Sequence, residues 1–334
     1  MKIIIIAISF LFPVFAFAGF PKAGTTAAPF LKIGVGARAV ALGGNFVALA
    51  NDANALYWNP AGIANINNIS FSATHTEWFA GITHGAVQFA VPMSENFAIG
   101  FDVLYLSSGN IEQTTLEQQN GNGIFYDASD FALGVTYARK LTNRFTVGVK
   151  AKFIQQRIFN EEASTFAVDF GTMYKTDFNG LRIGMNLANF GGSMQMSGND
   201  LLLVGEDPAT GNAFDMELKT ESWPLPILFR VGVAIDVMNR EEGFLQNDEN
   251  RITLAIDGNH PNDNEETIGM GIEYEWQEMF ALRMGYKGNH DVENFSFGGG
   301  FKLMLAGILF NIDYAYADFG DLESVQRFSA GFAF

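Results

Sequence analysis

Two histidines and a carboxylate in the first third of the chain could bind a metal ion. His75 and His84 lie on either side of the short stretch EWFAGIT, and Glu77 follows His75 by two residues. If the flanking segments pair as a hairpin with the histidines opposite each other, all three side chains share one face. Imidazole and carboxylate groups together suit a transition metal. The alternative is a polar pair at the rim of a sheet, and it is favoured because the metal site requires one particular register.

Other kinds of chemistry have weaker support in the sequence. The segment DGNHPNDNEE, residues 257–266, partly resembles a calcium loop but lacks regular ligand spacing and a terminal Glu. A solvated acidic outer loop is the favoured interpretation. The chain contains Ser and Asp throughout, yet no local signature of a Ser-His-carboxylate set, a phosphate loop or a metal motif. We therefore predict no enzyme activity, no cofactor and no metal site.

The first 18 residues, MKIIIIAISFLFPVFAFA, have one Lys, a short apolar core and small residues at Ala16 and Ala18. This layout is typical of a secretory signal peptide that is cleaved after Ala18. The alternative is a transmembrane helix, but the apolar core is short and no stop-transfer flank follows. No later apolar run approaches the roughly twenty residues that a membrane helix needs. A membrane-spanning mature chain would therefore have to be a barrel.

Composition also favours a barrel. The chain has no Cys, so an exported protein of this kind needs a large core or a closed sheet for its stability. Its formal net charge of -16 argues against binding nucleic acid. With 36 Gly, 33 Phe and only 17% charged residues, the composition suits a membrane barrel better than a soluble enzyme.

Alternating apolar and polar residues recur along the chain. In ENFAIGFDVLYLSSG, a period of two gathers five large apolar side chains on one face: Phe97, Ile99, Phe101, Val103 and Tyr105. Charged residues such as Lys150, Lys152 and Arg230 lie opposite such apolar rows. A soluble sandwich would show the same alternation. The rows here are long and rich in Phe, however, and segments of ten residues or more fit a tilted bilayer span.

Fourteen segments of this kind can be marked: 68–78, 82–92, 95–107, 130–140, 144–157, 163–175, 180–190, 225–237, 250–259, 266–276, 279–287, 293–303, 305–317 and 325–334. With both termini on the periplasmic side, the two longest connections, 108–129 and 191–224, face outward, and the inward turns are mostly tight. This is the rule for outer-membrane barrels, with 237–250 as one long exception. The sequence thus predicts an all-β fold, a fourteen-stranded antiparallel transmembrane β-barrel over residues 67–334.

The last predicted strand, VQRFSAGFAF, ends in an aromatic row formed by Phe328, Phe332 and Phe334. A terminal aromatic on such a strand resembles the signal read by the outer-membrane barrel assembly machinery, although an ordinary C-terminal strand is the alternative. Together with the signal peptide, this row indicates the outer membrane of a Gram-negative bacterium. The expected partners are then outer-membrane lipid and the assembly machinery.

The stretch NDANALYWNPAGIANI, residues 51–66, differs from the strands. Asp52 can cap a helical run over 53–58. Asn59 can end that run and cap a second turn that has Pro60 at its first position. A barrel of fourteen strands has a lumen wide enough to need filling. We therefore expect the N-terminal segment 19–66 to contain a partly helical plug, with a periplasmic lead-in of two turns as the alternative.

Residues 30–66 resemble the N-terminal block of the PorV/PorQ family of outer-membrane proteins. The matching elements are G-A-R-A at Gly36, Ala37, Arg38 and Ala39, L-G-G at Leu42, Gly43 and Gly44, A-N-D-A with Asn51 and Asp52, and Y-W-N-P-A-G-I with Tyr57, Trp58, Asn59, Pro60 and Gly62. The N-P-A-G core is also similar to the N-terminal region of FadL-type fatty-acid and hydrocarbon transporters. Both families are fourteen-stranded barrels with an N-terminal plug, and the longer block favours PorV.

The resemblance implies a non-catalytic carrier or scaffold in type IX secretion. Its partners would be cargo proteins that bear C-terminal signal domains, and attachment-complex proteins, which PorQ-like relatives help to hold. The binding surface would be the lumen mouth with the outer connections 108–129 and 191–224. The runner-up is a FadL-like passive transporter of hydrophobic small molecules, which predicts an apolar luminal pocket and a gap in the wall. The charged, Gly-rich luminal row disfavours it, and a purely structural barrel is a third possibility.

Overall fold

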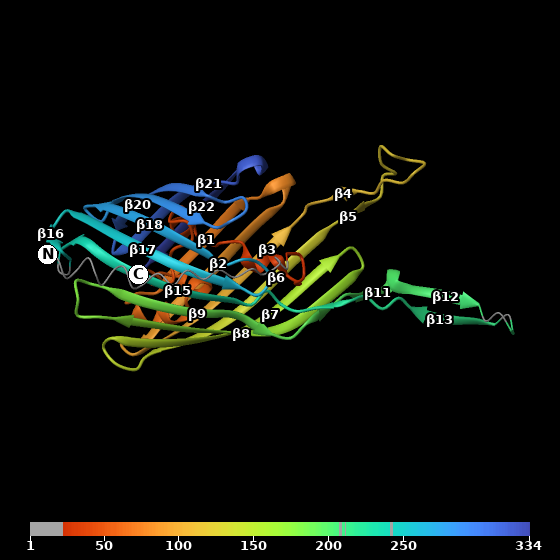
Figure 1. The fold of residues 1–334 in the computed structure, drawn as a ribbon, viewed down its shortest axis with the longest axis horizontal. Helices are drawn as coiled ribbons and strands as arrows, with labels where there is room; N and C mark the ends of the chain where they lie inside the picture. The colour runs from red at the N-terminus through yellow and green to blue at the C-terminus, as the bar shows by residue number, and fades with distance from the viewer. Residues whose placement is uncertain (1–22, 207–208, 211, 241–242) are drawn as a thin grey trace.

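The computed structural model describes residues 23–206, 209–210, 212–240 and 243–334, which form a closed antiparallel β-barrel (Figure 1). The expected signal peptide, residues 1–18, lies outside the described residues. The fourteen strands of the wall are β1 (Ser70–Glu77), β2 (Thr83–Ser94), β3 (Phe97–Ser107), β6 (Ala128–Lys140), β7 (Phe145–Ile158), β8 (Glu161–Lys175), β9 (Arg182–Gly191), β15 (Leu228–Asn239), β17 (Asn250–Pro261), β18 (Thr267–Trp276), β19 (Phe280–Gly288), β20 (Phe295–Leu305), β21 (Ile308–Asp318) and β22 (Ser324–Ala333).

Each wall strand pairs with its neighbour in the chain, and β1 closes the barrel against β22 with Ser70 opposite Ala333. Each of the fourteen predicted segments corresponds to one strand, with ends that agree within three residues. The prediction of a fourteen-stranded barrel is confirmed.

Apolar and polar residues alternate along the strands because successive side chains face the outside and the inside of the barrel in turn. On β3, the side chains of Phe101 and Val103 are exposed on the outside, whereas Asp102 is buried inside. On β6, Val135 is exposed and Thr136 is buried in the same way. The outer surface is therefore apolar and suited to lipid, and the polar residues of the wall point into the lumen.

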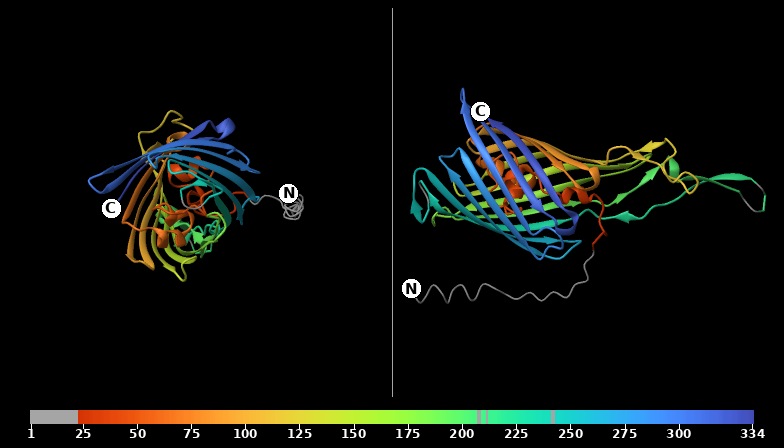
Figure 2. Two further views of the ribbon diagram at one scale, coloured as in Figure 1. Left: turned by 90° about the vertical axis from the view of Figure 1, so that its left-hand side faces the viewer. Right: turned by 90° about the horizontal axis from the view of Figure 1, so that it is seen from above.

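The two ends of the barrel differ in the length of their connections. At one end the long connections carry β4 (Ile111–Glu112), β5 (Phe125–Tyr126), β10 (Met194–Gln195), β11 (Ser197–Gly198), the 3-10 turn η4 (Asn199–Leu201), β12 (Leu202–Glu206), β13 (Ala213–Glu217) and β14 (Ser222–Trp223). Figures 1 and 2 show the β4–β5 and β12–β13 ribbons extending well beyond the wall. Short 3-10 turns η3 (Phe79–Gly81) and η5 (Gly320–Leu322) lie at the same end. We call this the outer end, because long loops face outward in such barrels.

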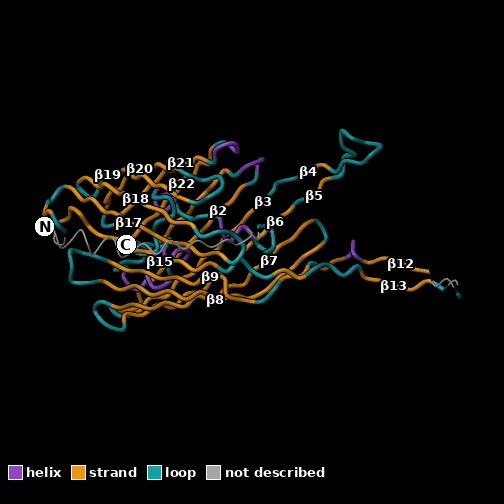
Figure 3. The backbone as a smooth tube through the Cα atoms, viewed as in Figure 1, coloured by secondary structure: helices purple, strands orange, loops and turns teal. Residues whose placement is uncertain are grey.

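The other end has tight turns, apart from the connection after β15. There the short strand β16 (Leu245–Gln246) pairs in parallel with the end of β15, so residues 245–246 of this long inner connection lie against the wall. Figure 3 shows the contrast between the strand-rich wall and the loops at its two ends.

Residues 29–65 lie inside the barrel, as the red and orange elements in Figure 2 show. They form η1 (Pro29–Lys32), α2 (Ala37–Ala41), α3 (Ala55–Trp58) and η2 (Pro60–Asn65). No helix among the described residues is both long and apolar enough to cross a bilayer. Phe30, Phe46, Leu56 and Ile63 from this segment are at most 1% exposed and lie in the main apolar cluster. The core of the protein is thus the lumen itself, and we call residues 30–66 the plug segment.

Candidate functional site: a filled lumen with an outer cavity

Glycines on the inner face of the wall let the plug backbone approach closely. A Cβ atom added to Gly148 of β7 would lie 2.4 Å from the backbone nitrogen of Ala61. One added to Gly285 of β19 would lie 2.0 Å from the nitrogen of Gly43. Both contacts are too short for any side chain, so these glycines are required by the plug. They explain why the luminal row of the sequence is rich in glycine.

Arg38 on α2 ties the plug segment to the wall. Its Nε and Nη2 atoms each donate to a carboxylate oxygen of Glu273 on β18, both at 2.8 Å. Nη1 donates to Asn51 Oδ1 at 2.7 Å and to Asp52 Oδ2 at 3.0 Å. Glu273 also accepts from Arg283 on β19 at 2.6 Å. A two-point guanidinium–carboxylate pair of this kind fixes orientation as well as position.

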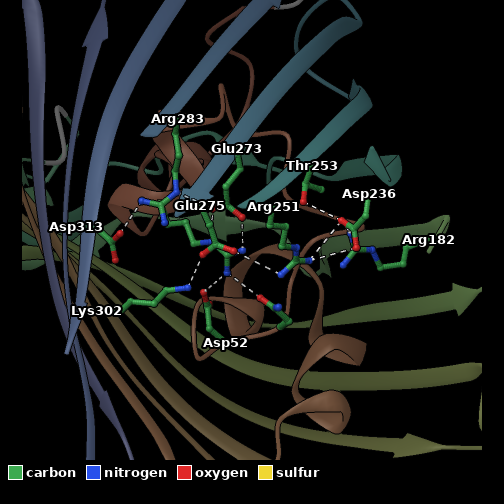
Figure 4. Close-up of polar contacts among 12 residues, drawn as sticks. Asp52, Arg182, Asp236, Arg251, Thr253, Glu273, Glu275, Arg283, Lys302 and Asp313 are labelled. Atoms are coloured by element: carbon green, nitrogen blue, oxygen red, sulfur yellow. Dashed lines mark hydrogen bonds and ion pairs between the residues drawn. The ribbon is translucent and has the colours of Figure 1, made fainter. Parts of the chain in front are cut away.

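The buried network continues along the wall, as Figure 4 shows. Arg283 reaches Asp313 of β21 at 2.6 Å, so its guanidinium bridges two carboxylates. Nearer the inner end, Asp236 accepts from Arg182 at 2.7 Å and from the Thr253 hydroxyl at 2.8 Å. These luminal charges are paired, which offsets the cost of removing them from water.

The electrostatics of Arg38 follow from this network. Burial by itself would lower the pKa of its guanidinium, but the carboxylates of Glu273 and Asp52 outweigh burial and raise the pKa well above its ordinary value. The side chain therefore keeps its charge inside the protein. It also lies over the Phe46 ring, with Cζ 5.1 Å from the ring centroid.

Local capping in the plug segment agrees in part with the sequence prediction. Asn59 begins η2 with its side-chain oxygen accepting from the Ala61 N–H, and Pro60 takes the first position, as predicted. Asp52 does not cap the helix directly. Its carboxylate accepts from the N–H of Asn54, two residues on, and α3 begins only at Ala55. Asp52 thus forms a turn just ahead of the helix, and its other carboxylate oxygen accepts from Arg38.

The other motif residues pack the plug segment. Tyr57 donates to the carbonyl of Leu31 at 3.0 Å, and Trp58 donates to the carbonyl of Val35 at 2.8 Å. The Arg230 guanidinium lies about 5 Å from both ring centroids.

Four glycines of the motif occupy positions that other residues would not fit. Three have positive φ: Gly36 (φ 83), Gly43 (φ 70) and Gly44 (φ 76). At Gly62, a Cβ atom would lie 2.3 Å from the carbonyl oxygen of Ala50. Ala37 donates its backbone N–H to Ser329 of β22.

A second anchor joins the plug to the opposite wall. Lys150 of β7 donates to Asp102 of β3 at 2.6 Å and to the backbone carbonyl of Leu56 at 2.9 Å. The amide nitrogen of Asn59 reaches the Thr172 carbonyl of β8 at 3.0 Å. The plug segment is thus bonded to strands on both sides of the lumen.

The plug segment divides the lumen into two cavities. The inner vestibule, of about 1040 Å³, is lined by the tight-turn end of the barrel, by plug residues 48–51 and 65–66, and by Asn67. The outer cavity, of about 350 Å³, is lined by outer connections and by plug residues that include Gly44 and Trp58. Among the described residues, no residue lines both cavities.

The outer cavity combines aromatic walls with positive charge. Trp78, Phe79 and Phe319 form a cluster in which ring centroids lie 4.8–5.4 Å apart. Arg327 of β22 lies beside it, with Cζ 5.4 Å from the Trp78 ring centroid. Sequence reasoning did not identify this cavity. Its only signal was the aromatic residues in the short outer connections, which are otherwise expected to be polar.

The wall is continuous around the barrel in the described residues. The β8–β9 ladder contains one irregularity, between Val168 and Phe170. There Asn189 of β9 adopts φ 63 and donates its N–H to Asp169 at 2.7 Å, and its side-chain nitrogen bonds the Pro226 carbonyl. This bulge is therefore closed by hydrogen bonds to β8 and to the residues just before β15.

The structure contradicts two interpretations of the sequence. One is the metal site of His75, Glu77 and His84, and the other is the fully solvated acidic loop over 257–266. Thr76, not His75, lies opposite His84, so His75 and Glu77 face outward while His84 is buried inside. Within the described ranges, no group of three or more potential metal-binding side chains occurs. The segment 257–266 is only partly a solvated acidic loop. Asp257 accepts from the Val47 N–H, and the buried carboxylate of Asp263 bonds Thr26 and Lys32 at 2.6 Å each.

The C-terminal aromatic row lies on the outside of the barrel. Phe328 and Phe334 are about half exposed, and Phe332 stacks on Phe71 of β1 with centroids 4.9 Å apart. The backbone of Phe334 exchanges two hydrogen bonds with Ile69 at the closing seam. The row is therefore accessible from the lipid side.

The profile of a family described as type IX secretion system protein PorV matches residues 20–222. A search of curated proteins gave no match. Three similar solved structures each cover 90% of this chain: the toluene transporter TbuX of Ralstonia pickettii (TM-score 0.54, 16% identity, 97% of its own chain), the toluene transporter TodX of Pseudomonas putida (0.55, 12%, 97%) and a FadL homologue of Pseudomonas aeruginosa (0.51, 12%, 98%).

At such identities these likenesses show the fold alone, a FadL-like barrel of the outer membrane. The profile match covers more than half of the sequence and includes the whole plug segment. The chain therefore belongs to the PorV family of type IX secretion system proteins.

Proposed function

We propose that this outer-membrane barrel is a non-catalytic carrier or scaffold that holds type IX secretion cargo by its C-terminal signal domain at the outer mouth. The observation that carries the proposal is a filled lumen in a chain of the PorV family. A barrel whose lumen is packed with its own N-terminal residues presents its ends, rather than a channel, to partners.

The shape of the outer end supports docking there. The β12–β13 ribbon extends beyond the wall and exposes Leu203, Phe214 and Met216 at 41–47%. In the observed register, Leu203 lies opposite Met216, so these side chains share one face of the ribbon. A two-stranded ribbon with one apolar face gains stability when a partner covers that face. We assign cargo contact to this ribbon and to the connection 108–129.

The alternative, a FadL-like passive transporter of hydrophobic small molecules, has less support. It calls for an open path across the barrel or through the wall. Arg38, Lys150 and Asn59 bond the plug segment to the wall, and the bulge at Asn189 is closed by hydrogen bonds. The outer cavity, by contrast, is the kind of site that a transporter would use first. A genetic test must therefore measure both secretion and uptake.

The test is deletion of the gene in the source organism, followed by fractionation and surface proteolysis of proteins that bear type IX C-terminal domains. We expect such cargo to accumulate in the periplasm, and the full chain to restore its surface display. A variant whose residues 202–217 are replaced by a short Gly-Ser linker should insert into the membrane yet fail to restore display. A matched control carries the same replacement at 241–244 on the inner end and should restore it.

Other results assign other roles. Cargo that crosses the membrane but is shed into the medium would indicate a PorQ-like role in the attachment complex. Normal secretion together with lost uptake of toluene would identify a transporter. Normal secretion and normal uptake would leave a structural barrel. Each of the last two results contradicts the carrier proposal.

A further inference from the structure

The outer cavity contains a buried cation, Arg327, for which the described residues supply no hydrogen-bonded counter-ion. Arg327 is 2% exposed, and its Nε and Nη1 atoms have no hydrogen-bond partner among the described residues. Its guanidinium lies over Trp78 and lines the cavity. An unpaired buried charge is costly, and a partner that supplied two carboxylate oxygens would remove that cost.

Neighbouring side chains do not supply such a partner. Across β22, β1 and β2, Arg327 lies opposite Thr76, which lies opposite His84. The Thr76 hydroxyl and both His84 ring nitrogens also have no partner in the described part of the chain. Glu293 lines the cavity too, but its carboxylate is bonded to Lys287 at 2.6 Å.

The charge of the cavity contrasts with that of the whole protein. Its lining includes four cations, Lys32, Arg230, Lys287 and Arg327, in a chain of formal net charge -16. Lys32 is paired with Asp263 and Lys287 with Glu293, so the positive charge that these pairs leave comes from the two arginines, with Glu265 as the other acid of the lining. The apolar part of the wall combines four aromatic side chains, Trp58, Trp78, Phe79 and Phe319, with aliphatic ones such as Ile33, Val40 and Leu228. Aromatic rings offer edges and faces to a flat apolar group, while the guanidinium offers a fork of donors to an anion.

We propose that the outer cavity binds a carboxylate carried on a compact aromatic or apolar body, with Arg327 as the counter-ion. The volume of about 350 Å³ lies within the range of small-ligand sites. The same chemistry occurs in a free aromatic acid and in the C-terminal residue of a polypeptide. The inference does not depend on the carrier role, because it requires only the cavity and Arg327.

Binding is tested on the full mature protein in lipid nanodiscs, by quenching of tryptophan fluorescence and by calorimetry. Two of the four tryptophans, Trp58 and Trp78, line the cavity. The probes are 3-phenylpropionate and its amide, and acetyl-Gly-Gly-Phe with a free or an amidated C-terminus. We expect a carboxylate to bind about tenfold or more tightly than its amide, since a charge-assisted pair is lost in the amide.

The source of the carboxylate follows from which probe binds. Preference for 3-phenylpropionate alone identifies a site for free acids, and preference for the peptide acid as well identifies a site for polypeptide C-termini. Either result supports the proposal. Equal binding of acids and amides overturns it.

Variants assign the effect to Arg327. Arg327→Met keeps the apolar volume and should reduce acid binding to the level of the amide, whereas Arg157→Met, at an exposed cation paired with Asp127, should change nothing. Heat-modifiable migration on a gel verifies that each variant is folded. A folded Arg327→Met variant that keeps the preference for acids contradicts the proposal.

A second pair of variants does not depend on removing the arginine. Thr76→Asp places a carboxylate opposite Arg327 in the β1–β22 register. We expect it to raise the thermal midpoint and to abolish acid binding, because the internal carboxylate occupies the guanidinium. Thr76→Val has the same shape without charge and should bind acids normally. Unchanged acid binding by Thr76→Asp overturns the assignment.

Discussion

Arg38 of the plug segment and Glu273 of β18 form a two-point ion pair across the lumen, although they are 235 residues apart in the sequence. Glu273 shares its carboxylate with Arg283, and Arg38 also holds Asn51 and Asp52. One guanidinium thus fixes two parts of the plug segment to one another and to the wall. The stability of the plug and that of the barrel are therefore coupled.

Removing Arg38 should loosen the plug. In Arg38→Met, we expect a loss of about 3 kcal/mol, because breaking a buried pair leaves part of the carboxylate charge uncompensated. The thermal midpoint of heat-modifiable migration reports the loss. The chain has no Cys, so Ala53→Cys introduces a single thiol, at a position that is only 1% exposed. We expect this thiol to react with a maleimide faster in the Arg38→Met protein than in the protein that keeps Arg38.

The control for that change is Arg144→Met, which breaks the exposed pair with Asp177 at the inner end. Exposed pairs contribute at most about 1 kcal/mol, so its midpoint and labelling rate should match the parent. Slow labelling at Ala53→Cys and an unchanged midpoint in Arg38→Met would show that the ion pair does not hold the plug.

Gly148 should tolerate no side chain. Gly148→Ala would place a Cβ 2.4 Å from the backbone of Ala61, and we expect a loss of about 1–3 kcal/mol as the plug is displaced. Gly258→Ala is the matched control, because a Cβ there meets nothing within 4 Å. Thermal midpoints compare the two variants, and equal midpoints would refute the close approach of the plug to β7.

Asn59 should be needed for both of its roles, as a cap and as a bridge. Its oxygen caps η2, and its nitrogen donates to the carbonyls of Val47 and Thr172. Asn59→Ala should cost about 3 kcal/mol, from the lost cap and two unsatisfied carbonyls. Asn59→Asp keeps a cap acceptor but loses the donor, so it should also destabilise the protein. Asn160→Ala, at an exposed amide, is the control, and full stability of Asn59→Asp would exclude the bridging role.

The Lys287–Glu293 pair at the rim of the outer cavity should give a pH-dependent stability. Burial raises the pKa of Glu293, but the ammonium of Lys287 at 2.6 Å outweighs burial and lowers the pKa below the ordinary 4.5. A lowered pKa contributes stability that is fully present above the ordinary value and is lost as pH falls through the folded-state value.

Glu293→Gln removes this contribution. The difference in thermal midpoint between the parent and Glu293→Gln should be largest near pH 7 and should shrink as the pH is lowered below about 4.5. Glu117→Gln, at an exposed carboxylate in the outer connection 108–129, should show no such trend. A difference that stays constant with pH would mean that the pair does not titrate as its geometry indicates.

The strands were predictable from the sequence because their signal is local. Successive residues of a strand face opposite sides of the wall. Phe101 and Asp102 could therefore be assigned to opposite faces without knowing which strand they pair with. The cap at Asn59 was predictable for the same reason, since it depends on two residues nearby. The plug motif could be recognised as unlike a strand, but its local pattern did not say what it would contact.

Tertiary structure decided the contacts between distant segments. The pairing of Arg38 with Glu273, and the packing of Gly148 against Ala61, depend on where the plug lies in the lumen, and no local pattern contains that information. Register decided that Thr76, rather than His75, lies opposite His84, because a shift of one residue moves a side chain to the other face. The outer cavity likewise exists only after closure of the barrel. Closure brings Trp78, in the connection after the first strand, together with Phe319 and Arg327 from the end of the sequence.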